Sequence, residues 1–225
     1  MNREVSRDRK DSNMEGWIAR WYARTRHNDI EDFREQAAKV AARLQPGSEV
    51  LEVAPGPGFF SIELAKRGQF RVAALDLSRT FVEIARGNAA EAGVDVAFHQ
   101  GNAADLPFPD GSFDFVYSSA AFKNFADPLG ALDEMYRVLR PGGEALIIDL
   151  RKDVSPGEID DYISHSGRKG FDAWFTRQAF RHMLIGRAYT TDQFNALAVA
   201  SKFADCRIEF DSIGMEVTLR RPRLI

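Results

Sequence analysis

The sequence contains little of what disulfide-bonded, metal-binding or membrane-spanning proteins require. Its 225 residues include one cysteine, Cys206, so neither an internal disulfide nor a cysteine-rich zinc site can form. The spacing of the four histidines from each other and from carboxylates is not typical of a metal site. We therefore expect no metal site. No apolar run approaches the roughly 20 residues of a membrane span, so none is expected either.

An excess of charge of one sign is also missing. The chain has 30 Lys and Arg against 33 Asp and Glu, a formal net charge of −3, whereas nucleic-acid binding requires many cations facing phosphates. We therefore expect no nucleic-acid partner. The first 15 residues alternate charges and lack the apolar core of a signal peptide, which predicts a cytoplasmic location.

Two helices are expected at the N-terminus. Trp17, Ile18, Trp21 and Tyr22 have the spacing of one apolar helix face, and a second helical pattern follows until Pro46-Gly47 ends it. The apolar face of the first helix either packs on the helices of the main domain or forms a lid over a ligand. We expect residues 1–45 to form N-terminal helices that act as a lid, followed by one domain over residues 46–225.

Short apolar runs alternate with helical patterns from residue 46 onward. The runs cover residues 50–53, 71–77, 94–100, 113–118 and 145–150, and a hairpin over 206–211 and 215–220 closes the chain. Alternation of this kind predicts an α/β fold, with a mostly parallel sheet and helices on both faces. The rhythm lapses over about 155–190, where aromatic and charged residues predict a helical insertion.

A glycine-rich turn follows the first of these strands and is the strongest local signal. Gly56 and Gly58 lie between a strand and a helix, where a ligand can approach bare backbone. Asp76 ends the next strand, a suitable place for a carboxylate that accepts hydrogen bonds from a ribose diol. A nicotinamide dehydrogenase would use nearly the same parts, but Ser61 stands where its fingerprint has Gly or Ala.

Four segments in order resemble the class I S-adenosylmethionine-dependent methyltransferases, in a branch of small enzymes that act on small molecules. They are VLEVAPGPG (50–58), ALDLS (74–78), GNAADLPFPDGSFDFVYSS (101–119) and MYRVLRPGGEALIIDL (135–150). The resemblance implies a Rossmann-like sheet of seven strands whose last strand is antiparallel. It also implies S-adenosylmethionine as the cofactor and a small molecule as the methyl acceptor.

The resemblance implies nine cofactor contacts. They are Glu52, Ala54, Gly56 and Gly58 around the methionine part, Ser118 with its carbonyl near the amino group, Asp76 at the ribose, and Leu77, Asn102 and Ala103 around the adenine. Two positions depart from the family pattern. Ala54 replaces the usual first glycine, which is tolerable if its φ is negative. Asn102 replaces a common aspartate and lacks its charge.

Residues 122–127 are similar to the motif after the fourth strand in quinone-biosynthesis methyltransferases, where an Arg-Asn pair is common. Lys123 replaces that arginine and lacks its bidentate fork. A quinone-type acceptor is therefore one of the alternatives. The arginine run over 220–223 is typical of a solvated tail and indicates no partner.

The expected chemistry needs little from the protein beyond orientation and exclusion of water, because a sulfonium is already an activated leaving group. If the acceptor needs a base, the candidates are Tyr22, Tyr162, His165 and His182, each of which also fits a packing or surface role. The alternative functions are a non-catalytic cofactor-binding or scaffold protein of the same fold, and a methyltransferase acting on RNA or protein. The oligomeric state is not predicted.

Overall fold

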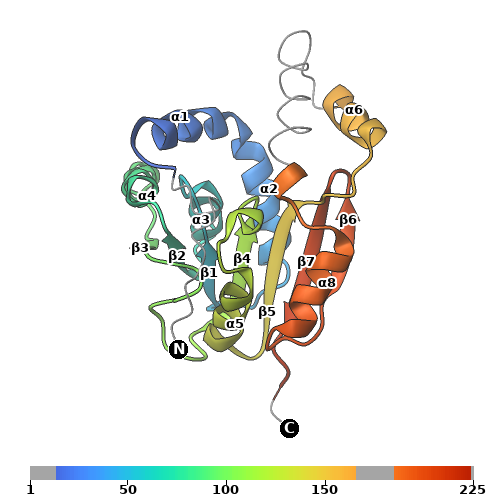
Figure 1. The fold of residues 1–225 in the computed structure, drawn as a ribbon. Coiled ribbons are helices and arrows are strands. Elements are labelled where there is room, and N and C mark those ends of the chain that lie inside the picture. The colour runs from blue at the N-terminus through green and yellow to red at the C-terminus, as the bar shows by residue number, and fades with distance from the viewer. Residues whose placement is uncertain (1–13, 166–184, 224–225) are drawn as a thin grey trace, which may run out of the picture.

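Seven strands form one sheet in the computed structural model, which describes residues 14–165 and 185–223 (Figure 1). Their order is β3-β2-β1-β4-β5-β7-β6, and β7 runs antiparallel to both of its neighbours, β5 and β6, while all the other pairs are parallel. The predicted fold class is confirmed. The strands are β1 Glu49–Val53, β2 Arg71–Asp76, β3 Ala97–Gln100, β4 Phe113–Ser119, β5 Leu139–Leu150, β6 Arg207–Asp211 and β7 Gly214–Arg220.

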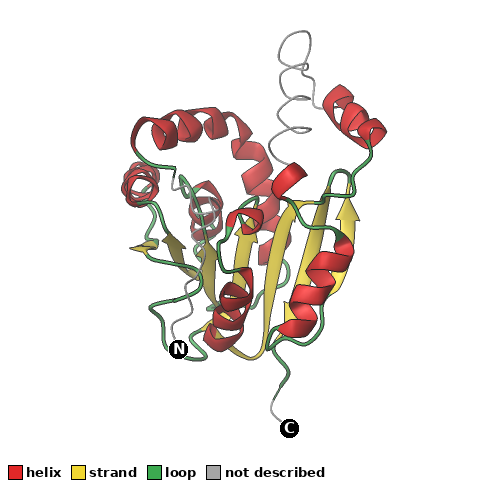
Figure 2. Cartoon of the chain, viewed as in Figure 1, coloured by secondary structure: helices red, strands yellow, loops and turns green. Residues whose placement is uncertain are grey.

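Helices cover both faces of the sheet (Figure 2). The helices are α1 Gly16–Arg26, α2 Ile30–Ala41, α3 Phe59–Ala65, α4 Arg79–Ala92, α5 Pro128–Val138, α6 Pro156–His165 and α8 Thr191–Ala200, with short 3₁₀ turns η2 His27–Asp29, η3 Phe122–Asn124 and η5 Ile185–Arg187. No helix in the described ranges is long and apolar enough to cross a membrane. The cytoplasmic location stays a prediction.

Alternate residues of the central strands are buried on opposite faces, which divides the core into two main layers. Leu51 and Val53 pack with α5 and α8, whereas Val50 packs with α2 and α3 on the other face. Helix α2 is part of this core, because its Ala37 and Val40 are buried beside Phe60 and Tyr117. Of the expected N-terminal unit, only α1 therefore lies outside the two main layers, and it packs on α4.

The buried face of α1 differs from the predicted one. Ala19 and Ala23 are buried, while Trp17, Ile18 and Trp21 are exposed, so the apolar stripe is not the packing face. Small alanine side chains let α1 approach α4 closely, and the large indoles remain outside. Of the predicted stripe, only Tyr22 turns inward, where its ring meets Phe81 edge-on at 5.9 Å between centroids.

Strand β5 is longer than predicted. It starts at Leu139, directly after α5, and includes the Pro141-Gly142-Gly143 turn that was expected to separate helix from strand. The pairing with β4 shifts register between Phe113 and Phe115, which accommodates these residues at the end of the sheet. In the opposite sense, β3 starts only at Ala97 rather than at residue 94.

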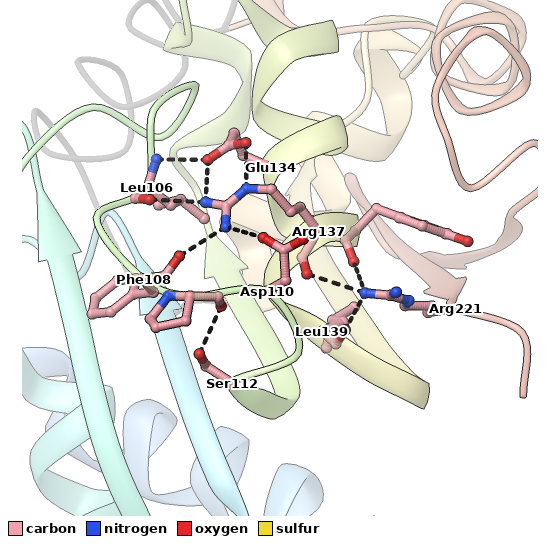
Figure 3. Close-up of polar contacts among 10 residues, drawn as sticks. Leu106, Phe108, Asp110, Ser112, Glu134, Arg137, Leu139 and Arg221 are labelled. Carbon is pink, nitrogen blue, oxygen red and sulfur yellow. Dashed lines mark hydrogen bonds and ion pairs between the residues drawn. The ribbon is translucent and has the colours of Figure 1, made fainter. Parts of the chain in front are cut away.

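The loop after β3 is fastened to α5 by Arg137, as Figure 3 shows. The guanidinium donates to the carbonyls of Leu106 and Phe108 at 2.9 and 2.8 Å and pairs with Asp110 and Glu134 at 2.8 and 2.7 Å. One side chain thus joins two of the four segments that carry the family resemblance.

Within the terminal arginine run, Arg221 departs from the predicted solvated tail, whereas Arg220 and Arg223 are exposed. Arg221 donates to the carbonyls of Tyr136, Arg137 and Leu139, the last at 2.6 Å, and so satisfies orphan carbonyls at the C-terminus of α5 (Figure 3). Arg220 pairs with Glu144 at 3.0 Å.

Candidate active site

The residues expected to hold a cofactor meet at one edge of the sheet. They follow or end β1, β2, β3 and β4, which are adjacent in the order β3-β2-β1-β4 and parallel, so their carboxyl ends lie together. Ligands of open α/β sheets bind at this edge, where the strand order reverses. Helix α1 lies at the same edge (Figure 1).

The carboxylate of Asp76 is fixed by backbone donors on both sides. Its Oδ2 accepts from Gly56 N at 3.0 Å and its Oδ1 accepts from Ser78 N at 2.8 Å. Burial raises the pKa of Asp76, and these two backbone hydrogen bonds partly oppose the rise. Each oxygen keeps lone-pair capacity for a further donor, so the arrangement fits two vicinal hydroxyls.

The two glycines of the turn have different roles. Gly56 has φ +54° and nothing lies within 4 Å of where a Cβ would be, so its backbone faces open space. Gly58 has φ +80°, and a Cβ there would come within 2.9 Å of Ala85 and Phe98. Gly56 therefore leaves room for a ligand, whereas Gly58 permits close packing of α3 against α4 and β3.

Ala54 does not have the negative φ that was expected; its φ is +60°. Its amide donates to the carbonyl of Leu75 at 2.8 Å, which continues the contact with β2 before the chain turns. That turn requires the left-handed conformation that the family supplies with glycine. The methyl group is accommodated with strain.

Glu52 is buried at the floor of this turn and contacts Ser61. Its Oε2 accepts from the Ser61 amide at 3.1 Å and from the Ser61 hydroxyl. Burial is the main cause that raises the pKa of Glu52 to about 7; the Ser61 hydrogen bonds oppose it and the nearby Asp76 charge adds to it. Ser61, noted only as a departure from the dinucleotide fingerprint, is thus the partner of an expected site residue.

The residues expected around an adenine lie nearer the surface. Asn102 is exposed, and its Oδ1 accepts from Ala104 N at 2.9 Å, which leaves one lone pair for a ligand. Leu77 and Ala103 are partly buried, and Ala103 packs on the core. All three positions remain predictions, compatible with a flat apolar ring.

Ser118 has a buried hydroxyl group without a described hydrogen-bond partner, which the sequence did not predict. It is 1 % exposed, and its Oγ has no hydrogen-bond partner in the described part of the chain. Only its carbonyl was expected to contact the cofactor. An unpaired buried hydroxyl at this edge of the sheet can supply a further ligand contact.

A buried ion pair beside the site was missed by the sequence reasoning. Lys123 Nζ, on the turn η3 after β4, lies 2.7 Å from Asp149 Oδ1 on β5 and also donates to the Ala120 carbonyl; the two paired side chains are 5 % and 3 % exposed. The Lys123 amide donates to the other carboxylate oxygen at 2.9 Å. Asp149 in an otherwise apolar strand was the available signal.

Glu15 was missed as well. Its carboxylate accepts from the amides of Arg79 and Thr80 at 2.9 and 3.1 Å and from the Thr80 hydroxyl, at the N-terminus of α4. These bonds, led by that hydroxyl, hold the pKa of Glu15 below its usual value. They anchor the start of α1 next to Asp76. No sequence signal identifies this contact.

The structure describes the side chains of two of the four base candidates, and these two lie on different elements. Tyr22 packs on Phe81 under α1, and Tyr162 packs on the cluster of Ile159, Ile163 and Ile213 near the β6–β7 turn. His182 and the side chain of His165 lie outside the described residues. A role for any of them as a base stays a prediction.

A crevice of about 540 Å³ lies at the opposite edge of the sheet. Arg43 and Arg140 in its wall are paired with Glu144 and Asp114. None of the expected cofactor residues lines it. We therefore do not assign it to the reaction.

Comparison with known proteins gives a family match over the central part of the chain. A family model described as a methyltransferase domain matches residues 51–147. The demethylmenaquinone methyltransferase of Listeria monocytogenes is 38% identical over 128 residues, 56% of this chain and 54% of that protein. That of Deinococcus radiodurans is 39% identical over 119 residues, 52% of this chain and 49% of that protein. The chain thus spans about half the length of these relatives.

Solved structures share the fold at low identity. A proposed S-adenosyl-L-methionine-dependent methyltransferase from Methanococcus maripaludis superposes with a TM-score of 0.73 at 21% identity, covering 92% of this chain and 94% of that one. A SAM-dependent methyltransferase from Aquifex aeolicus gives a TM-score of 0.61 at 22% identity, covering 82% and 89%.

Proposed function

We propose that this chain is a class I S-adenosylmethionine-dependent methyltransferase that transfers a methyl group from S-adenosylmethionine to a small-molecule acceptor. The observation that carries the proposal is the open space at Gly56 beside the doubly anchored carboxylate of Asp76. A protein that had lost its cofactor would have no need to keep this space free. The scaffold alternative is therefore disfavoured.

The roles of the protein groups follow from their positions. Asp76 accepts hydrogen bonds from the ribose hydroxyls, and the backbone around Ala54 and Gly56 surrounds the methionine part. Glu52 shapes the floor through Ser61 and, when ionised, attracts an ammonium group. Bound S-adenosylmethionine supplies a methyl group on a sulfonium, so no protein acid has to activate the leaving group. The protein then holds the acceptor in line and excludes water.

For the acceptor we propose a reduced quinone, methylated on a ring carbon. The relatives that act on demethylmenaquinone support this class. Two partly buried aromatic residues after β4 and before α8 also support it: Phe125 and Tyr189 pack on the fully buried Phe122, at 5.2 and 5.9 Å between ring centroids. Lys123 Nζ is paired with Asp149 and donates to the Ala120 carbonyl, so the pair is neutral as a whole, and the ammonium keeps one N–H that can donate to an oxygen of a phenolic ring.

The test has two stages. Calorimetric titration with S-adenosylhomocysteine, with NADH in a parallel cell, is expected to show saturable binding of the first alone. Asp76→Ala is expected to weaken this binding, while Asp192→Ala, which removes an exposed acid on α8, leaves it unchanged. Labelled methyl donor is then offered with a short-chain reduced quinone. Absence of S-adenosylhomocysteine binding by folded protein would refute the proposed methyltransferase function. Transfer of the labelled methyl group only to RNA or protein would show that the acceptor is one of these and not a reduced quinone.

A further inference from the structure

Four apolar side chains form an exposed patch along α1 and the residues before it. We call Met14, Trp17, Ile18 and Trp21 the tryptophan face. Trp17 is 74% exposed, Trp21 59% and Ile18 42%. Large apolar side chains gathered in this way on a surface mark an interaction site more often than scattered ones do. The two indoles lie one helical turn apart, so both project from the same side of α1.

The tryptophan face is held outward by the opposite side of α1. Ala19 and Ala23 are buried, and Tyr22 packs on Phe81 of α4. At the start of the helix, Gly16 N donates to Thr80 Oγ1 at 3.0 Å, and the Glu15 carboxylate binds the first amides of α4. These contacts fix the rotation of the helix. The indoles therefore stay in solvent when no partner is present.

Basic residues flank the tryptophan face. Arg20 and Arg24 are exposed on α1 and make no ion pair within the ranges that the structure describes. Helix α1 contains three arginines and no acidic residue, although the chain as a whole carries a formal charge of −3. The third, Arg26, is paired with Asp29 at 2.6 Å. The surface around the indoles is thus locally positive and complementary to an anionic partner.

We propose that the tryptophan face docks the protein on the surface of an anionic phospholipid bilayer. Indole rings are amphipathic and favour the headgroup region, and arginine guanidinium groups pair with lipid phosphates. A helix with apolar residues along one line and arginines beside it, lying flat on the protein, has the layout of an interfacial anchor. A second copy of this chain fits less well, because Arg20 and Arg24 would face their own positive charges.

The position of α1 connects membrane docking with the proposed active site. The helix lies at the edge of the sheet where the proposed site is (Figure 1), so docking places that site at the membrane surface. This step rests on the proposed function, since a lipophilic quinone acceptor partitions into the bilayer. The docking itself depends only on the exposed face and its charge.

The experiment is co-sedimentation of the full chain with large vesicles of phosphatidylcholine alone or mixed equally with phosphatidylglycerol, at low and high salt. We expect binding to the anionic vesicles that weakens at high salt, with little binding to neutral ones. Trp17→Ala/Trp21→Ala is expected to lower the partition coefficient by roughly tenfold or more, because the indoles supply the apolar contact. Arg20→Glu/Arg24→Glu is expected to abolish the preference for anionic vesicles.

Phe210→Ala is the matched control, since Phe210 is another exposed aromatic residue, 61% exposed, on β6. It is expected to bind vesicles like the unmodified protein. The proposal is overturned if anionic vesicles are not bound, if all the variants bind equally, or if the tryptophan variant only dissociates a dimer. Circular dichroism shows that each variant is folded. S-adenosylhomocysteine binding, measured without lipid, tests the cofactor site. It also separates failure of docking from failure of the proposed function.

Discussion

Replacing Glu52 by glutamine is expected to make folding stability much less dependent on pH. Glu52 is buried, and its pKa is raised from 4.5 to about 7, mainly by burial. A carboxyl whose pKa is higher in the folded state than in the unfolded state adds to the free energy of unfolding. This addition is complete below the unfolded-state pKa and is lost as the pH rises through the folded-state pKa. Between about pH 4.5 and 7 the unmodified protein thus loses stability as the pH rises. The Glu52→Gln variant does not lose this stability, because glutamine never ionises.

The size of the effect follows from the same values. The rise of about 2.5 pH units, at about 1.4 kcal/mol per unit, amounts to about 3 kcal/mol above pH 7. Glutamine has nearly the same shape, and its side-chain oxygen can still accept from the Ser61 amide and hydroxyl. Glu52→Gln should therefore match the unmodified protein near pH 5 and exceed its stability by about 3 kcal/mol at pH 8.

The assay is urea unfolding followed by circular dichroism at pH 5, 6, 7 and 8, with the free energy of unfolding extrapolated to zero urea. Glu91→Gln on α4 is the control, because it removes an exposed carboxylate of the same type. A stability difference between Glu52→Gln and the unmodified protein that stays constant from pH 5 to 8 would refute the reasoning. It would mean that Glu52 is already ionised in the folded protein at pH 5.

Three further substitutions test separate parts of the site. Asp76→Ala is expected to weaken S-adenosylhomocysteine binding by about 2–3 kcal/mol, since it removes charge-assisted hydrogen bonds; unchanged affinity in calorimetry would show that Asp76 does not hold the ribose. Ala54→Gly is expected to raise the free energy of unfolding by about 1 kcal/mol by relieving the +60° φ, and urea melts showing a loss would mean that this backbone is not strained. Lys123→Met leaves Asp149 buried and unpaired and is expected to cost about 3–5 kcal/mol of stability, whereas a melt unchanged in both Lys123→Met and Asp149→Asn would show that the pair contributes little.

Several local features could be predicted from the sequence, because helix capping and turn formation depend on residues that are close together in the chain. Ser78 caps α4 by accepting from Phe81 N, and Asp127 caps α5 by accepting from Gly130 N, as their positions before helical patterns predict. The strand–turn–helix around Gly56 was predictable for the same reason. The predicted order of strands and helices was therefore nearly complete, and the errors in element bounds lie at ends such as those of β3 and β5.

Other features depend on residues far apart in the chain. Lys123 meets Asp149 from 26 positions away, and Glu15 meets Thr80 from 65 positions away. No periodicity or spacing identifies such pairs, because they depend on how two elements pack. The rotation of α1 is the same kind of problem: the apolar spacing of Trp17, Ile18 and Trp21 predicts a buried face, yet packing against α4 selects the small Ala19 and Ala23.

The sequence by itself determined the α/β architecture, the glycine turn and the acid after β2, since hydrophobic period, turn chemistry and helix capping are local properties of the chain. The tertiary structure alone decided which carboxylates are buried, that Ala54 has a positive φ, that Arg137 fastens the loop after β3, and that the indoles of α1 face solvent. Burial, long-range pairing and helix rotation are consequences of packing. They exist only once the elements are assembled.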